Sequence, residues 1–206
     1  MKRVLCKSTV FLLSILLFLP MLFACGGESD EVILAEAKTL LAKSAVVNAL
    51  CFGEGLAPVA EGGFSSGGYT EADAASLEKY GVASVADIRA LVSAVYSVAA
   101  ADQLEQIIFV PVQSEGGFAS YRRYYDAQDG ERAVLMVKRE YTPVARGEVR
   151  YENIRVAENG RNRAKILVDI TVTDGERSRT LKDESFSLRR EEGGWRLDTL
   201  TYASVD

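Results

Sequence analysis

The chain has 206 residues, a net charge of −5 and no histidine, with 48% hydrophobic and 26% charged residues. This length suits one domain or a small pair of domains. Without histidine there can be no Ser-His-Asp or Cys-His catalytic unit, no HExxH zinc site and no histidine pH switch. The acidic balance argues against nucleic acid as a partner.

The N-terminal segment has the composition of an export signal. Three positive charges precede residues 10–24, which are apolar apart from one serine and one proline. A membrane-spanning helix needs about 20 apolar residues, so this shorter run is typical of a secretory signal peptide. The run ends in Leu22-Phe23-Ala24-Cys25, and Gly26-Gly27-Glu28-Ser29-Asp30 follows.

These residues resemble the lipobox of bacterial lipoproteins, with a small residue before an obligatory cysteine. The resemblance implies a signal peptide over 1–24, diacylglycerol on the sulfur of Cys25, and acylation of its new amino group. Cys25 would thus join the protein to membrane lipid, and two or more acyl chains anchor stably where one is marginal. The expected location is the outer face of the cytoplasmic membrane, or the outer membrane if there is one. A signal peptide cut elsewhere, or an uncleaved signal anchor, is the alternative.

Removal of residues 1–24 changes the charge and cysteine counts. The remaining 182 residues carry 21 positive and 29 negative charges, a net charge of −8. If Cys25 is acylated, Cys51 is the only cysteine left, so no intramolecular disulfide can form. Its place on the apolar face of a predicted helix indicates a buried residue and not a nucleophile.

The mature chain divides into a short lipidated tether, 25–30, and a single α+β domain, 31–206. Helical periodicity and capping residues predict that helices fill the acidic part, 31–109. Six glycines and a proline predict a long loop over 52–68. The expected helices span 31–52, 71–80, 85–99 and 101–109.

An arginine-rich part, 117–203, has the alternation of β-strands. Turn signals at Gln128-Asp129-Gly130, Asn159-Gly160, Asp174-Gly175 and Gly193-Gly194 separate the predicted strands. In 162–173 alternate residues are apolar, and Asp169 lies on the polar face. This pattern predicts a curved antiparallel meander of five or six strands, with the N-terminal helices packed on one face. The expected strands span 118–127, 133–141, 148–157, 162–173, 177–190 and 195–203.

Helices followed by a meander that ends in Gly193-Gly194-Trp195-Arg196-Leu197 resemble the NTF2-like (cystatin-like) cone. The resemblance covers roughly residues 31–202 and implies helices packed into a curved sheet. A plain layer of helices on an antiparallel sheet fits the same order of elements.

The densest mixture of aromatic and arginine residues lies at 118–126. There Tyr121, Arg123 and Tyr125 are candidates for binding a sugar or an anionic group, because tyrosine offers flat faces and arginine a planar fork. The alternative is a strand whose aromatic residues fill the core. No catalytic residue, metal site or cofactor is predicted.

The resulting functional hypothesis is a lipid-anchored cell-envelope protein that acts as a non-catalytic binding or scaffolding module. Its partner would be an envelope protein or a glycan. One alternative is a cone that carries a small hydrophobic or anionic ligand. A second is an isomerase or hydrolase with an Asp and a Tyr in such a pocket.

Overall fold

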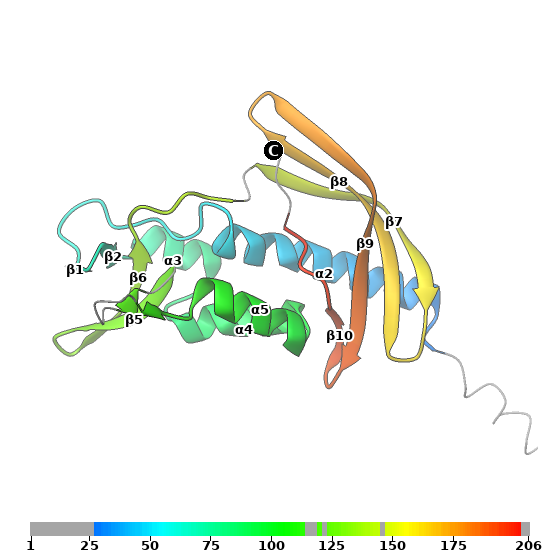
Figure 1. The fold of residues 1–206 in the computed structure, drawn as a ribbon, viewed down its shortest axis with the longest axis horizontal. Helices are drawn as coiled ribbons and strands as arrows, with labels where there is room; N and C mark the ends of the chain where they lie inside the picture. The colour runs from blue at the N-terminus through cyan, green and yellow to red at the C-terminus, as the bar shows by residue number, and fades with distance from the viewer. Residues whose placement is uncertain (1–26, 114–118, 121–122, 145–146, 203–206) are drawn as a thin grey trace, which may run out of the picture.

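A computed structural model describes residues 27–113, 119–120, 123–144 and 147–202 (Figure 1). Within these ranges the chain forms helices and short strands first, followed by long strands. The helices are α2 (Asp30–Cys51), α3 (Ala74–Tyr80), α4 (Val85–Val95) and α5 (Val98–Ile108). None of the described helices is long and apolar enough to cross a membrane. Residues 1–26, and with them the predicted signal peptide and Cys25, lie outside the described ranges.

The C-terminal strands form an antiparallel meander in the order β10-β9-β8-β7. Its strands are β7 (Glu148–Asn159), β8 (Arg163–Asp174), β9 (Arg177–Glu191) and β10 (Gly194–Leu197). The sheet curls around α2, and both its first strand and its last strand contact that helix (Figure 1). Consecutive antiparallel strands joined by tight turns, one with Gly175 at a φ of 60°, confirm the meander that the turn signals predict.

The predicted single sheet of five or six strands is wrong, because the described strands form two sheets of four and one separate pair. The second sheet has the order β1-β2-β6-β5, and β3 pairs with β4. Its strands are β1 (Ser65–Ser66), β2 (Tyr69–Glu71), β5 (Tyr124–Asp129) and β6 (Arg132–Lys138), and the separate pair is β3 (Val112–Gln113) with β4 (Ala119–Ser120).

Strands β1 and β2 lie inside the part of the chain predicted to hold only helices and a loop. Gly67 and Gly68 have positive φ angles of 56° and 86°, which close the turn between these two strands. Tyr69 then pairs with Lys138 of β6, across a long separation in sequence. Strands of two and three residues are too short to show a period of two, so the glycines alone predicted a loop.

The predicted helix over 85–99 is also wrong at its C-terminal end. Helix α4 stops at Val95, Tyr96 is extended, and Ser97 begins α5 by accepting a hydrogen bond from the N–H of Ala100. The N–H of Ser97 donates to the carbonyl of Leu197 at 2.8 Å. The break between the two predicted helices therefore lies earlier in the chain than expected, at a backbone contact with β10.

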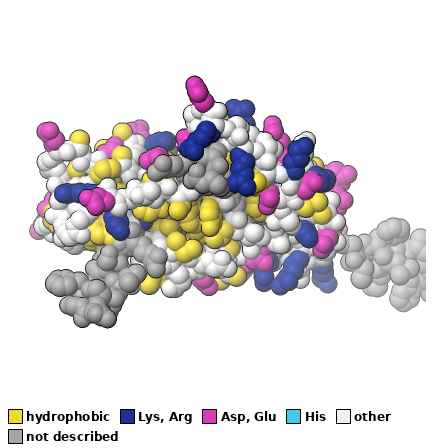
Figure 2. All heavy atoms as spheres, turned by 45° about the horizontal axis from the view of Figure 1, so that its top comes forward, with side chains coloured by type: hydrophobic (Ala, Val, Ile, Leu, Met, Phe, Trp, Pro, Cys, Tyr) yellow, Lys and Arg dark blue, Asp and Glu magenta, His cyan; other side chains and the backbone are white. Residues whose placement is uncertain are grey.

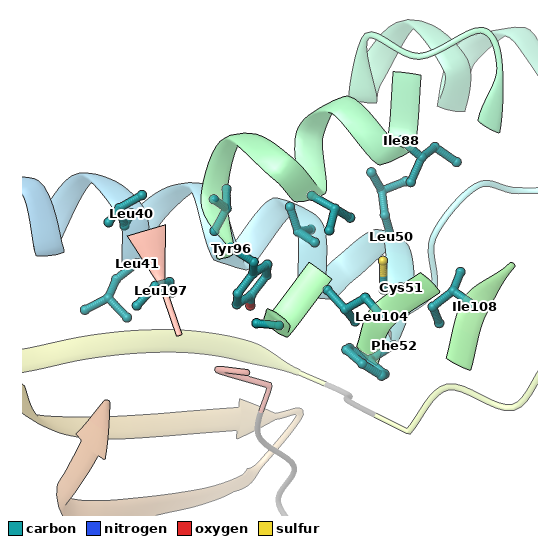
Figure 3. Packing of buried hydrophobic residues seen from close by; sticks show 14 of the residues in the cluster. Leu40, Leu41, Leu50, Cys51, Phe52, Ile88, Tyr96, Leu104, Ile108 and Leu197 are labelled. Atoms are coloured by element: carbon teal, nitrogen blue, oxygen red, sulfur yellow. The ribbon is translucent and has the colours of Figure 1, made fainter. Parts of the chain in front are cut away.

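The main hydrophobic core lies between the helices and the concave face of the curled sheet. The first half of α2 faces the sheet, and its C-terminal residues Leu50 and Cys51 pack against Ile88 of α4 and Leu104 of α5 (Figure 3). Fully burying one such side chain contributes about 2 kcal/mol. On β8 the buried residues alternate as the sequence predicts; these are Ala164, Ile166, Val168, Ile170 and Val172.

The end of the predicted tether is bound to this sheet. The indole Nε1 of Trp195 donates to the carboxylate of Glu28 at 2.7 Å, and Arg190 forms an ion pair with Glu28 at 2.6 Å. The side chain of Asn159 donates to the carbonyl of Glu28 at 2.8 Å and to the carboxylate of Asp30 at 2.7 Å. The domain's contacts therefore begin three residues after Cys25.

Candidate functional site

The guanidinium of Arg123, one of the three predicted binding residues, lies at the C-terminal end of α2. Its Nη1 donates to the carbonyl of Cys51 at 3.1 Å, and its Nη2 donates to the carbonyls of Gly53 and Glu54 at 2.7 and 2.8 Å. The side chain is only 1% exposed. A helix leaves its last carbonyls without intrahelical partners and carries a partial negative charge at that end. Arg123 therefore caps α2 with a buried positive charge.

Two tyrosines complete the surroundings of this guanidinium. Tyr124 accepts a hydrogen bond from Nε of Arg123 at 2.8 Å and donates to the carbonyl of Leu50 at 2.8 Å. The ring of Tyr141 lies 3.7 Å from the guanidinium carbon, in cation–π geometry. The described partners of Arg123 are thus carbonyls, a hydroxyl and aromatic rings, with no carboxylate among them, so its charge is stabilised by dipoles.

A cavity of about 210 Å³ opens beside Arg123, between residues 54–58 and the end of β6. Lys138, Arg139 and Tyr141 also line it, and Glu54 is the acidic residue of its lining. Three cationic side chains around a small cavity favour an anionic group. A wider hollow of about 500 Å³ shares Pro58 and Arg139 with this cavity.

Of the three predicted binding residues, the structure describes Arg123 and Tyr125, and these two contact different partners. Tyr121 lies outside the described residues. Tyr125 is half-buried and its ring packs edge-on against Tyr69, with 5.0 Å between the ring centroids. That contact belongs to a second, smaller hydrophobic cluster on the sheet of β1, β2, β6 and β5. The residues that meet Arg123 are Tyr124 and Tyr141 instead, and nothing in the local sequence pattern pointed to Tyr141.

A third hollow of about 260 Å³ lies along α2, where the start of β7 and the C-terminal segment approach it. We call it the α2 groove. Tyr202 is 48% exposed and stacks on Phe52 with 4.3 Å between the ring centroids. Figure 2 shows hydrophobic side chains gathered near the middle of this side of the molecule. The groove is lined by Ala45, Asn48, Ala49, Gly53, Glu54, Lys79, Tyr80, Gly147, Val149 and Tyr202.

Behind the α2 groove lies a buried polar network. The side chain of Asn48 donates to Thr201 at 3.1 Å and accepts from the hydroxyl of Tyr96 at 3.1 Å. Thr201 in turn donates to Ser44 at 2.9 Å. Burial raises the pKa of Tyr96 far above its usual range. The network joins α2, the connection between α4 and α5, and the C-terminal segment through satisfied neutral hydrogen bonds.

Cys51 is fully buried, as the sequence predicts. Burial raises the pKa of its thiol to about 12, against the opposing effect of the nearby Arg123 charge. At neutral pH this cysteine is therefore a protonated core residue and a poor nucleophile. Within the described ranges, no three His, Cys, Asp or Glu side chains are grouped closely enough to hold a metal ion.

Comparison with known proteins gives no relative for this chain: no family model, curated protein or solved structure matches it.

Proposed function

We propose that this protein is a lipid-anchored component of the cell envelope and acts as a non-catalytic binding or scaffolding module. Acyl chains on Cys25 would hold it to the membrane, and the α+β domain would face away from the cytoplasm. The α2 groove would receive an envelope protein or a glycan.

The observation that carries the anchor is the position of Glu28. Glu28 contacts Trp195 and Arg190 and follows Cys25 by three residues in the sequence, which supports the proposal. Cleavage before Cys25 would therefore leave the domain complete and the acylated cysteine at its edge. A cleavage site further along the chain would remove residues that the sheet binds.

Acylation can be tested by expressing the full chain in a bacterium and measuring the mass of its N-terminal peptide. We expect an acylated peptide that starts at Cys25, and we expect the larger precursor to accumulate when globomycin inhibits the lipoprotein signal peptidase. Cys25→Ser should abolish acylation, whereas Cys6→Ser is a matched control within the signal segment. Release of the wild-type protein from membranes without detergent would contradict the anchor.

The binding role can be tested with a photo-crosslinking amino acid placed at Tyr202 in cells. A matched control carries the same group at Glu131, an exposed residue in the turn between β5 and β6. We expect a discrete adduct from position 202 that is missing from position 131. Equal adduct patterns from the two positions, or no adduct from either, would contradict the α2 groove as the binding face.

A second candidate function is a carrier of a small anionic ligand, and the cavity beside Arg123 favours it. A curved sheet packed on a helix is also consistent with the NTF2-like resemblance. Titration of the purified protein with small carboxylates and phosphates, followed by native mass spectrometry, tests this alternative. If the protein binds such an anion and the double variant Lys138→Gln/Arg139→Gln binds it more weakly, the carrier function is favoured over a purely scaffolding role.

The enzyme alternative requires a buried carboxylate beside a tyrosine in a pocket. Asp169, the residue that such a pocket would need on the inner face of β8, lies on the outer face, where it contacts Asn153 and Asp183. Among the described residues, the buried polar or charged ones are Ser44, Asn48, Thr70, Ser76, Ser97, Arg123 and Thr201.

A further inference from the structure

The end of the curled sheet from which the N-terminal segment leaves carries two adjacent turns. One joins β7 to β8 at residues 160–162, and the other joins β9 to β10 at residues 192–193. The N–H of Arg190 donates to the carbonyl of Asn162 at 2.9 Å, which holds the two turns side by side. The turn between β5 and β6 lies at the opposite end of the molecule's long axis (Figure 1).

The link between this end and the proposed anchor is short. A Cβ added to Gly27 would lie 3.1 Å from the side-chain oxygen of Asn159, so Gly27 itself rests against the first turn. Cys25 precedes Gly27 by two residues, and two residues span at most about 7 Å. The headgroup layer of one leaflet is about 5–7 Å thick, from the difference between the whole bilayer and its hydrocarbon core. An acylated Cys25 therefore allows the first turn to reach the level of the lipid headgroups.

The link cannot lengthen without breaking contacts of Glu28. Its carboxylate is held by Trp195 and Arg190, and its carbonyl by Asn159. Trp195 is only 3% exposed, so this attachment point belongs to the rigid core. Glu28 is thus held firmly by the domain, three residues after Cys25 in the sequence.

The charges at this end suit contact with lipid phosphates. Arg161 and Arg163 are exposed, and no described carboxylate forms an ion pair with either. Arg163 stands directly opposite Arg189 across the strands. Arg189 is itself paired with Asp198, and the charge of Arg163 also acts on that carboxylate, so Arg161 is the cation at this end without a described acidic neighbour. Figure 2 shows Lys and Arg side chains at this end of the molecule, interspersed with Asp and Glu side chains. Arginine binds phosphate through its planar fork of donors.

Most acidic residues at this end are already engaged. Glu158 lies 3.6 Å from Lys165, and Glu191 accepts a hydrogen bond from the N–H of Val98 at 3.1 Å. Glu192 remains exposed beside the second turn. The attraction is therefore local to Arg161 and Arg163, and does not come from a net positive field.

We propose that the two turns, with Arg161 and Arg163, form a membrane-contact surface that binds phospholipid headgroups. The inference rests on the proposed acylation of Cys25 and adds an orientation to it. The domain stands on this end, with its long axis pointing away from the bilayer. The β5–β6 turn, the cavity beside Arg123 and the α2 groove then face the envelope space.

The test uses the full acylated protein in vesicles of phosphatidylethanolamine and phosphatidylglycerol that contain a lipid with a nitroxide on its headgroup. A fluorophore is attached to Asn162→Cys at the proposed surface or to Glu131→Cys at the far end. We expect loss of most of the fluorescence from position 162 and little loss from position 131. Equal quenching at the two positions would overturn the proposal.

A second arm measures the contribution of the arginines. Near an anionic surface, each arginine changes the docked-to-undocked ratio about fivefold. The variant R161Q/R163Q should therefore lower the ratio of quenched to unquenched label at position 162 by about 25-fold. The matched control R177Q/R179Q, at the opposite end of the same sheet, should leave the ratio unchanged. An unchanged ratio in R161Q/R163Q would overturn the role of these arginines.

The two proposals fail in different ways. The mass of the N-terminal peptide is measured before reconstitution, so a protein that lacks acyl chains contradicts the proposed anchor. An acylated protein whose label at position 162 escapes quenching contradicts only the membrane-contact surface.

Discussion

The carboxylate of Asp169 accepts a hydrogen bond from the backbone N–H of Asp183 at 2.9 Å. Asp183 has a positive φ of 58° and lies in a bulge of β9. On the other side, Asn153 in a bulge of β7 has a φ of 49° and donates to the same carboxylate at 2.8 Å. Asp169 of β8 thus binds the bulge of β7 and the bulge of β9 at the same level of the sheet. Bulges increase bending and twist, so this level is where the sheet curls around α2.

Replacement of Asp169 by alanine removes both hydrogen bonds and should lower the thermal unfolding midpoint. The reason is that two non-glycine residues would then keep left-handed backbones without the acceptor that stabilises them. Glu176→Ala, in the exposed turn after β8, is the control and should leave the midpoint unchanged. Unfolding can be followed through the fluorescence of Trp195, the single tryptophan. Equal midpoints for the two variants would show that the bulges do not depend on Asp169.

The same carboxylate should make part of the stability depend on pH. Hydrogen bonds from Asn153 and from the Asp183 N–H hold the pKa of Asp169 below its usual range. A lowered folded-state pKa contributes stability that is fully present above the unfolded value of about 3.9 and is lost as pH falls through the lower folded value. Asp169→Asn should therefore be less stable than wild type at pH 7 and lose less stability on acidification below pH 4. Parallel stability curves for the two proteins would contradict this linkage.

Much of this fold could be predicted from local sequence, whereas the contacts that shape its sites could not. Alternation identified the strand around Ile166, and Ser84-x-x-Asp87 shows the residue types of the N-cap that Ser84 forms. The similar motif Thr70-x-x-Asp73 predicts a cap at Thr70, which is wrong, because Thr70 lies in β2 and Asp73 caps α3. The pairing of β2 with β6 was hidden, because two short strands far apart in sequence carry no period of their own. The partners of Arg123 at the end of α2 were hidden for the same reason, since they lie about 70 residues away along the chain.

Asp198 fastens the end of β10 to the start of α5. Its carboxylate accepts two hydrogen bonds from Arg189, at 3.1 and 2.9 Å, and one from the hydroxyl of Ser97. Partial burial opposes ionisation, but these hydrogen bonds outweigh it and hold the pKa of Asp198 below its usual range. Asp198→Ala should lower the free energy of unfolding by about 2 kcal/mol, the scale of hydrogen bonds to a charged group.

The control for Asp198 is Asp174→Ala, which removes an exposed ion pair with Arg177 and should cost less than about 1 kcal/mol. Urea denaturation of both variants gives the comparison. A loss from Asp198→Ala no larger than that from Asp174→Ala would mean that β10 is held by its apolar contacts alone.

Gly55 is required where the loop after α2 passes the guanidinium. Its φ is +66°, and a Cβ there would lie 2.2 Å from Nη2 of Arg123 and 2.2 Å from the hydroxyl of Tyr124. Gly55→Ala should lower the free energy of unfolding by about 3 kcal/mol, about 1 from the left-handed backbone and the rest from the displaced side chains. Gly62→Ala separates the two effects, because Gly62 has a φ of +75° and open space around it. Gly62→Ala should lower the free energy of unfolding by only about 1 kcal/mol, measured by urea denaturation. Equal losses of stability in the two variants would contradict the close contact of Gly55 with Arg123 and Tyr124.

Arg123→Lys should destabilise the end of α2 and expose Cys51. Lysine cannot reproduce the fork that serves three carbonyls and a hydroxyl, so we expect a loss of about 3 kcal/mol in unfolding free energy. With its pKa raised to about 12, the Cys51 thiol in the wild-type protein should be about one part in ten thousand thiolate at pH 8 and react very slowly with maleimide. Opening of the helix end in Arg123→Lys should speed this labelling, measured by mass spectrometry of the peptide that contains Cys51. Arg139 is an exposed neighbour, and the control Arg139→Lys should be labelled as slowly as the wild-type protein. Equally slow labelling of Cys51 in Arg123→Lys would show that the end of α2 stays closed without the guanidinium of Arg123.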